Sequence, residues 1–83
     1  MEQEKVLPEQ FRAARGLLNM SQENLAERAG FSSMTIKRAE GICQPQPSAE
    51  ALAKIRVALE TAGIVFLSGN GNGPGVALRK VGA

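Results

Sequence analysis

Apolar residues recur at helical spacing through most of the chain and give way to a strand-like run near its end. Phe11, Ala14 and Leu18 lie three and four residues apart, which predicts the core-facing stripe of a first helix. Pro8 suits the first position of that helix, where the missing N–H needs no partner. Asn19 is expected to end it, because Asn enters the left-handed region more easily than most residues.

Two short helices joined by a tight turn are predicted in the middle of the chain. Ser21 and Ser32 are expected to cap their N-termini, since a hydroxyl can accept from the free N–H groups there. Gly30 ends the earlier helix in a left-handed turn, which is easily accessible to glycine. The later helix spans about residues 32–40 and points Ile36 inward. The inward face of the earlier helix is Leu25, Ala26 and Ala29.

The last third of the chain predicts a fourth helix and a β-hairpin. Two prolines make the segment 41–47 a loop, after which Ser48 caps a helix that Gly63 ends. The strands of the hairpin would be Ile64–Leu67 and Val76–Val81, joined by a Gly/Asn-rich turn. A lone hairpin is marginal in water, so it must pack on the helices, on a second subunit, or on both. The core-facing positions of the fourth helix are Leu52, Ile55, Leu59 and Ala62.

The expected fold is therefore mainly α, with four helices and a C-terminal β-hairpin. Residues 1–6 form a disordered start, residues 7–62 the helical domain, and residues 63–83 a Gly-rich tail that is a candidate dimerisation element. At 83 residues the chain forms one small domain that buries roughly 60% of its unfolded surface, so a dimer interface would help to stabilise it.

Composition excludes several classes of protein. A single cysteine, Cys43, and the absence of His exclude a disulfide framework and a Cys/His metal site, and fit a reducing compartment. No apolar run approaches the ~20 residues that span a bilayer, and the polar N-terminus is not a signal peptide, so we expect a cytoplasmic protein, associated with the nucleoid, and no membrane partner. The net charge of +2 is too small to establish a nucleic-acid partner.

Catalytic chemistry has little support in the sequence. There is no His and no Asp, Cys43 lacks a base, and no pair of Glu residues occupies an evident pocket, so we expect no enzyme and no cofactor. The glycines of residues 69–75 could suggest a phosphate loop, but such a loop needs a following helix, and here Pro74 and a β-like run follow. Arg79 and Lys80 either touch a DNA backbone or are ordinary solubilising charges.

The helix at residues 32–40 has the pattern of a helix that reads DNA. A major groove about 12 Å wide admits one α-helix, which must bury one face and expose polar groups on the other. Arg38 can form a bidentate pair with guanine, and Lys37 can reach guanine or phosphate. For each predicted base contact the alternative is a solvated or phosphate-facing side chain. The predicted base contacts are Ser33, Met34, Lys37 and Arg38.

The preceding helix would hold the DNA backbone. Its N-terminus carries free N–H groups and partial positive charge, and Gln22 adds an amide donor. Arg15 and Glu40 are expected to pair and tie the reading helix to the first helix, with a contribution of roughly 0 to 1 kcal/mol if partly exposed. The alternative is two independent solvated charges. The predicted phosphate contacts are Ser21, Gln22, Ser32 and Thr35.

The chain from about Pro8 to Ala62 resembles the Cro/lambda-repressor-like helix-turn-helix family, also called the XRE family. The resemblance implies that helix 32–40 enters the major groove, that Gln22 contacts phosphate, and that the family's buried ion pair falls on Arg15 and Glu40. The chain departs from the family pattern at three positions. Asn24 stands where Glu is common, and Ala39 stands where a larger aliphatic residue is common. The family's glycine usually lies two residues after the Glu, whereas here Gly41 follows Glu40 directly. The residues that carry the resemblance are Arg15, Ser21, Gln22, Leu25, Ala26, Gly30, Ile36, Glu40, Leu52, Ile55 and Leu59.

These features predict a sequence-specific regulator of transcription that binds double-stranded DNA as a homodimer on a two-fold symmetric operator. Repression by occluding polymerase is the plainest mechanism, and activation is an alternative. A second hypothesis is a protein-interaction module, such as an antitoxin, that binds a partner through the helical domain or the hairpin. Two further alternatives are an ordinary helical hairpin without a DNA role and a DNA-binding fragment of a larger assembly.

Overall fold

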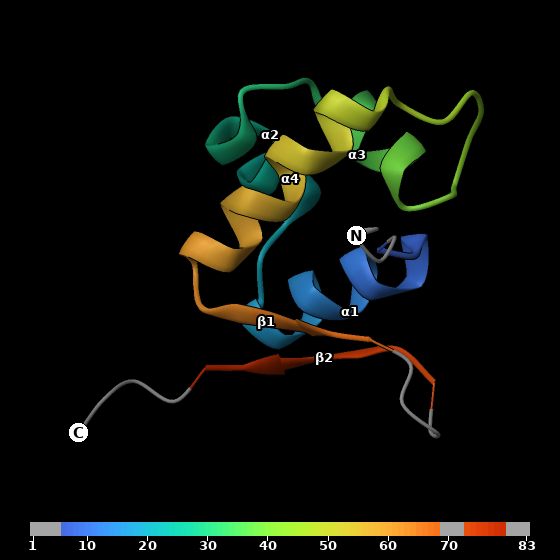
Figure 1. The fold of residues 1–83 in the computed structure, drawn as a ribbon. Helices are drawn as coiled ribbons and strands as arrows, with labels where there is room; N and C mark the ends of the chain where they lie inside the picture. The colour runs from blue at the N-terminus through green and yellow to red at the C-terminus, as the bar shows by residue number, and fades with distance from the viewer. Residues whose placement is uncertain (1–5, 69–72, 80–83) are drawn as a thin grey trace.

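The computed structural model describes residues 6–68 and 73–79, which form four helices followed by a two-stranded antiparallel hairpin. Figure 1 shows three levels, with α2 and α3 on one side, α1 and α4 between, and the hairpin on the opposite side. The predicted mainly helical fold with a small hairpin is confirmed. The elements are α1 (Pro8–Leu18), α2 (Gln22–Ala29), α3 (Ser33–Ala39), α4 (Ala49–Thr61), β1 (Ile64–Leu67) and β2 (Gly75–Leu78).

The first three helices end in the same left-handed turn, in which one residue with positive φ lets the next N–H reach back five residues along the chain. Asn19 and Gly30 occupy this position, as predicted, and Gly41 occupies it after α3, with φ of 55°, 83° and 80°. Gly41 therefore ends α3 directly after Glu40. The three closing bonds run from Met20 N to Arg15 O, from Phe31 N to Ala26 O, and from Ile42 N to Lys37 O, at 3.0, 2.9 and 2.9 Å.

Serine hydroxyls cap the N-termini of α2, α3 and α4, as the sequence predicts. The Oγ atoms of Ser21, Ser32 and Ser48 each accept from the main-chain N–H three residues ahead, at 3.0, 3.3 and 3.1 Å. These bonds satisfy N–H groups that have no partner within a helix, and so set where α2, α3 and α4 begin. The N-cap residue of α1, Leu7, makes no such bond, and Gln10 instead reaches back, its Oε1 accepting from the N–H of Leu7 at 2.7 Å.

The core lies where α1, α2, α3 and α4 meet β1. Phe11 packs its ring edge-to-face on Phe66 of the hairpin, with ring centroids 6.0 Å apart and planes at 75°. Leu18, Leu52 and Ala29, which were predicted to face the core, are partly buried at its border. The buried side chains of the core are Phe11, Ala14, Leu25, Ala26, Ile36, Ala39, Ile55, Leu59 and Ile64.

The second strand of the hairpin begins one residue earlier than predicted, at Gly75 instead of Val76. β2 runs from Gly75, opposite Leu67, to Leu78, opposite Ile64. The predicted strand end at Val81, like the turn at residues 69–72 and the start at residues 1–5, lies outside the described residues. Val6, predicted to be disordered, is half-buried and packs against the core, because an apolar side chain next to the core gains free energy by burial.

The hairpin docks on the helices of its own chain. Gln10, buried on α1, donates from Nε2 to the carbonyls of Leu67 and Gly75, at 3.2 and 2.9 Å, and so holds both strands at one end. At the other end Arg79 donates from Nη2 to the carbonyl of Glu60 at the end of α4, at 3.2 Å. Of the two supports that the sequence left open, the helices are therefore one.

We expect Gln10→Leu to lower the free energy of unfolding by about 1–3 kcal/mol, because the substitution leaves main-chain groups at the α1 N-terminus and on both strands without their partner. Urea-induced unfolding measures the change. Arg12→Leu, at an exposed position of the same helix, is the control and should change stability by no more than about 0.5 kcal/mol. Equal losses in the two variants would show that the Gln10 bonds contribute nothing specific.

No helix within residues 6–68 and 73–79 has the length and apolar character needed to cross a membrane.

Candidate nucleic-acid interface

The turn between α2 and α3 brings the two central helices into contact. The turn consists of residues 30–32. Gly30 ends α2 in the left-handed conformation, and Ser32 is the N-cap of α3. Leu25 of α2 and Ile36 of α3 have no exposed surface, and both lie in the core. Small side chains, Ala26 and Ala39, fill the remaining buried positions of these helices, so α2 and α3 can pack closely.

The predicted base-contact residues lie on the part of α3 that remains accessible. Met34 has 46% of its surface exposed, and Ser33, Lys37 and Arg38 are half-buried. Because Ile36 and Ala39 face the core, the helix presents hydroxyl, thioether, ammonium and guanidinium groups on its other sides. This face therefore offers several hydrogen-bond donors and two positive charges to a ligand outside the domain.

Three of the predicted DNA contacts at α3 have partners within the chain. The Sδ of Met34 lies 3.5 Å from the Sγ of Cys43, in the loop after α3, so the thioether rests against that loop. Ser32 and Thr35, predicted phosphate contacts, lie with their hydroxyl oxygens 3.2 Å apart. The Ser32 hydroxyl also caps α3, so these two groups form one hydroxyl pair at the start of the helix.

Arg38 holds a buried donor that has no partner among the described residues. Its Nε is inaccessible to solvent and makes no hydrogen bond, although the residue as a whole is only half-buried. A buried N–H without an acceptor costs free energy, roughly 1–3 kcal/mol for a polar group.

A buried ion pair ties α3 to α1, and this is the pair that the sequence suggested. Arg15 donates from Nε to one carboxylate oxygen of Glu40 at 2.6 Å and from Nη2 to the other at 3.0 Å. The Glu40 side chain has no exposed surface, whereas the Arg15 side chain is 21% exposed. The sequence predicted that a partly exposed pair would contribute little to stability. In the structure the pair is instead bidentate, and its Glu40 carboxylate is buried.

Further contacts orient the Arg15 guanidinium. Its Nη1 donates to the carbonyl of Met20, in the turn before α2, at 2.9 Å. The hydrogen bond with Glu40 raises the pKa of Arg15, partial burial lowers it, and the negative charges of Glu40 and Glu23 raise it again, with a net increase. Arg15 therefore stays charged throughout the physiological pH range.

Gln22 is a third donor to Glu40, which the sequence did not predict. Its Nε2 donates to Glu40 Oε1 at 3.1 Å, so the amide predicted to face phosphate is partly engaged inside the domain. The second N–H of that amide and the first N–H groups of α2 carry the remaining donor capacity at this helix end. The signal that could have revealed this role is that a buried carboxylate has more acceptor sites than one Arg satisfies.

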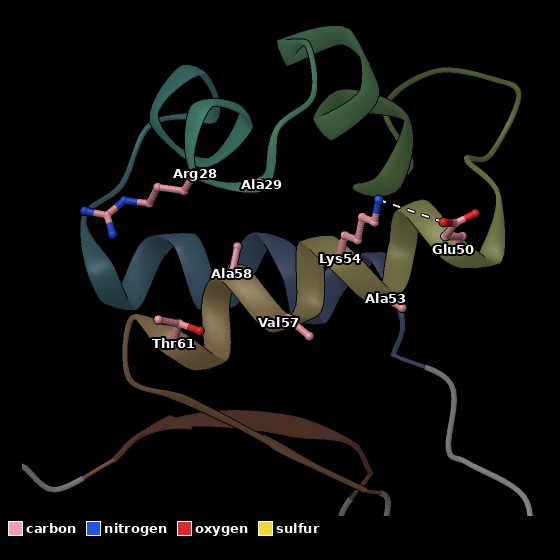
Figure 2. A pocket seen from close by; sticks show the side chains of 8 residues that line it. All are labelled: Arg28, Ala29, Glu50, Ala53, Lys54, Val57, Ala58 and Thr61. Atoms are coloured by element: carbon pink, nitrogen blue, oxygen red, sulfur yellow. Dashed lines mark ion pairs between the residues drawn. The ribbon is translucent and has the colours of Figure 1, made fainter.

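A surface groove lies between the end of α2 and α4, and no residue of α3 lines it. Its volume is about 600 Å³, and Val57 on it is 57% exposed. Figure 2 shows Ala58 directed from α4 toward the end of α2, and Lys54 paired with Glu50 one turn earlier, at 3.8 Å. The lining residues are Arg28, Ala29, Glu50, Ala53, Lys54, Val57, Ala58 and Thr61.

No cluster of three or more His, Cys, Asp or Glu side chains that could hold a metal ion is found within residues 6–68 and 73–79. Comparison with models of protein families gives no match to this chain, and comparison with curated proteins gives none either.

Proposed function

We propose that this protein is a sequence-specific regulator of transcription of the Cro/lambda-repressor-like kind, which binds double-stranded DNA through α3. The observation that carries the proposal is the pairing of a core-facing side of α3, at Ile36 and Ala39, with an accessible side that presents hydroxyl groups and the cations Lys37 and Arg38. A helix with this division suits the major groove, where base edges offer acceptors to such donors.

The anchoring of α3 supports the proposal. A reading helix must keep its position relative to the parts that hold the DNA backbone, because phosphate contacts set the register of the protein on the duplex. Glu40 connects the end of α3 to Arg15 of α1 and to Gln22 at the start of α2. The N-terminus of α2, with its free N–H groups, is the proposed phosphate site. The hydrogen bonds among Arg15, Gln22 and Glu40 would keep α3 at a fixed position relative to this phosphate site.

The active form would be a homodimer with two reading helices in major grooves one turn apart, about 34 Å. The plainest mechanism is repression, in which a bound dimer blocks polymerase. The test is selection of bound sequences from a random double-stranded DNA pool. Enrichment of a palindrome with half-sites one turn apart supports the proposal. No enrichment with a folded protein contradicts it.

We expect Arg38→Ala to weaken binding to the selected sequence by about 1–3 kcal/mol and to relax the preference at one base pair, because a bidentate contact discriminates among bases. Competition binding against variants of the selected site measures both effects. Arg28→Ala removes the same charge from an exposed position in the last turn of α2 and should leave the sequence preference unchanged. Equal weakening on all sequences would make Arg38 a phosphate contact.

Binding of a partner protein, as in an antitoxin, is a second candidate, and the groove between α2 and α4 favours it. The apolar residues that line the groove are Ala29, Ala53, Val57 and Ala58, and Arg28, which also lines it, forms no ion pair within the described residues. This surface suits an amphipathic helix that carries acidic side chains. If the DNA selection gives no enrichment, Val57→Asp should abolish binding of that partner while the protein stays folded.

A further inference from the structure

Met34 is the one apolar side chain among the predicted base contacts of α3. It lies second in that helix, and 46% of its surface is exposed. Single apolar side chains are common on protein surfaces, so exposure alone gives Met34 no role. The unbranched side chain of methionine has several rotatable bonds and samples many conformations when it is free in solvent. Its use in recognition therefore depends on what holds it.

A thiol from the loop after α3 holds this side chain. The Sγ of Cys43, nine positions along the chain, donates to the Sδ of Met34 at 3.5 Å. Cys43 is itself half-buried. A hydrogen bond between two sulfur atoms is weak, but it gives a flexible side chain one preferred direction. The bond uses the sulfur of Met34 and leaves its terminal methyl group available to a ligand.

The loop is fixed in place, so Cys43 can hold Met34 and does not simply follow it. The N–H groups of Gly41 and Ile42 donate to carbonyls in the last turn of α3, at 3.1 and 2.9 Å. Gly41 also approaches α1 so closely that a Cβ built on it would lie 3.3 Å from the Cβ of Pro8. The two residues before Cys43 are therefore bonded to α3 and lie against α1.

We propose that Cys43 positions Met34 to contact the C5-methyl group of a thymine in the major groove. The proposal rests on the proposed function of α3. The first residues of a reading helix contact the base edges, and the thymine methyl is the apolar group that the major groove displays. Among the hydroxyl, ammonium, guanidinium and thioether groups of α3, only the thioether side chain matches it. We therefore expect a thymine in each half-site of the operator.

Holding Met34 before binding has a physical benefit. A flexible side chain that becomes ordered on binding loses conformational entropy, and this loss lowers the affinity. The bond with Cys43 orders Met34 when the protein folds, so less entropy is lost when DNA binds. A free Met34 could also turn away from a base without a methyl group, whereas a held Met34 meets the same point of the groove. Discrimination for thymine therefore depends on Cys43 as well as on Met34.

Methyl NMR of the free protein tests the hold on Met34 without DNA. In the full chain with labelled methionine methyl groups, Cys43→Ala should lower the order parameter of the Met34 methyl group by roughly a third, because the side chain is released. The methyl group of Met20, which packs against the core, is the internal control and should keep its order parameter. An unchanged order parameter for Met34 would overturn the proposal.

Replacing thymine by uracil tests the base contact, because it removes only the methyl group. Each thymine of the selected sequence is replaced in turn, in both half-sites, and fluorescence anisotropy gives the Kd. One position should weaken binding of the unaltered chain roughly fourfold per half-site, whereas Met34→Ala should bind both duplexes equally. Ile42→Ala, which truncates a 56% exposed apolar side chain next to Cys43, should keep the difference. A sequence without a methyl-sensitive position, or one whose sensitivity survives Met34→Ala, would overturn the proposal.

The ratio of the two Kd values separates positioning from a general structural role. At the methyl-sensitive position, Cys43→Ala should reduce the ratio of the Kd for the uracil duplex to the Kd for the thymine duplex to about half or less of its original value. Cys43→Ser keeps a donor there and should retain more of the ratio than Cys43→Ala. A purely structural loss would weaken binding to both duplexes equally. An unchanged ratio in Cys43→Ala, or equal ratios in the two variants, would overturn the role of Cys43.

The same measurements separate this inference from the proposed function. If the chain selects a DNA sequence but no thymine in it is methyl-sensitive, the function stands and the inference is wrong. If methyl NMR shows that Cys43 holds Met34 but the chain selects no DNA sequence, the function is wrong and the contact with thymine is wrong with it.

Discussion

Replacing Arg15 by Met is expected to lower the free energy of unfolding by about 3–5 kcal/mol, because the substitution leaves the Glu40 carboxylate buried without its cation. Glu40 has no exposed side-chain surface and receives two of its three hydrogen bonds from Arg15. Gln22 alone cannot balance the charge. Urea or thermal unfolding followed by circular dichroism measures the loss.

Two comparisons make this prediction specific to the buried pair. Lys54→Met breaks the ion pair with Glu50 on α4, whose side chains are 61% and 81% exposed, and should cost no more than about 0.5 kcal/mol. The double variant Arg15→Met, Glu40→Met should lose less than Arg15→Met alone, since no charge is then left buried. A loss for Arg15→Met no larger than that for Lys54→Met would contradict the prediction.

Affinity for the selected DNA sequence is expected to fall steeply with salt. If each subunit of a dimer neutralises ~3 to 4 phosphates, the logarithm of the association constant should fall with the logarithm of salt concentration at a slope of about −6. Between 50 and 200 mM salt the affinity should then drop by a factor on the order of 10³ to 10⁴. Fluorescence anisotropy of a labelled duplex, titrated at several salt concentrations, measures the slope.

Lys37→Gln provides the matched test of this electrostatic account. If Lys37 contacts phosphate, its loss should make the slope shallower by about 1 per subunit while the sequence preference stays the same. If Lys37 instead reads a guanine, the slope should change less and the preference at one base pair should relax. A salt response close to zero in the unaltered protein would remove the phosphate contacts from the proposal.

The sequence by itself determined where the helices begin and end. Capping is a local interaction, in which a Ser hydroxyl bonds an N–H three residues ahead, so Ser21, Ser32 and Ser48 were recognisable without any knowledge of the tertiary structure. The same holds for Asn19 and Gly30, whose left-handed conformation reflects their own backbone preferences. Helical periodicity likewise predicted the burial of Ile36, Ile55 and Leu59.

The tertiary structure alone decided how strongly Glu40 is buried, what holds it, and what holds the hairpin. These properties depend on residues far apart in the chain. Gln22 reaches Glu40 across 18 positions, and Gln10 reaches Gly75 across 65. A Gln has the same local preferences whether it faces solvent or bonds a buried acceptor, so its neighbours in sequence carry no signal of either role. Only packing, which removes water from these groups, makes their partners a requirement.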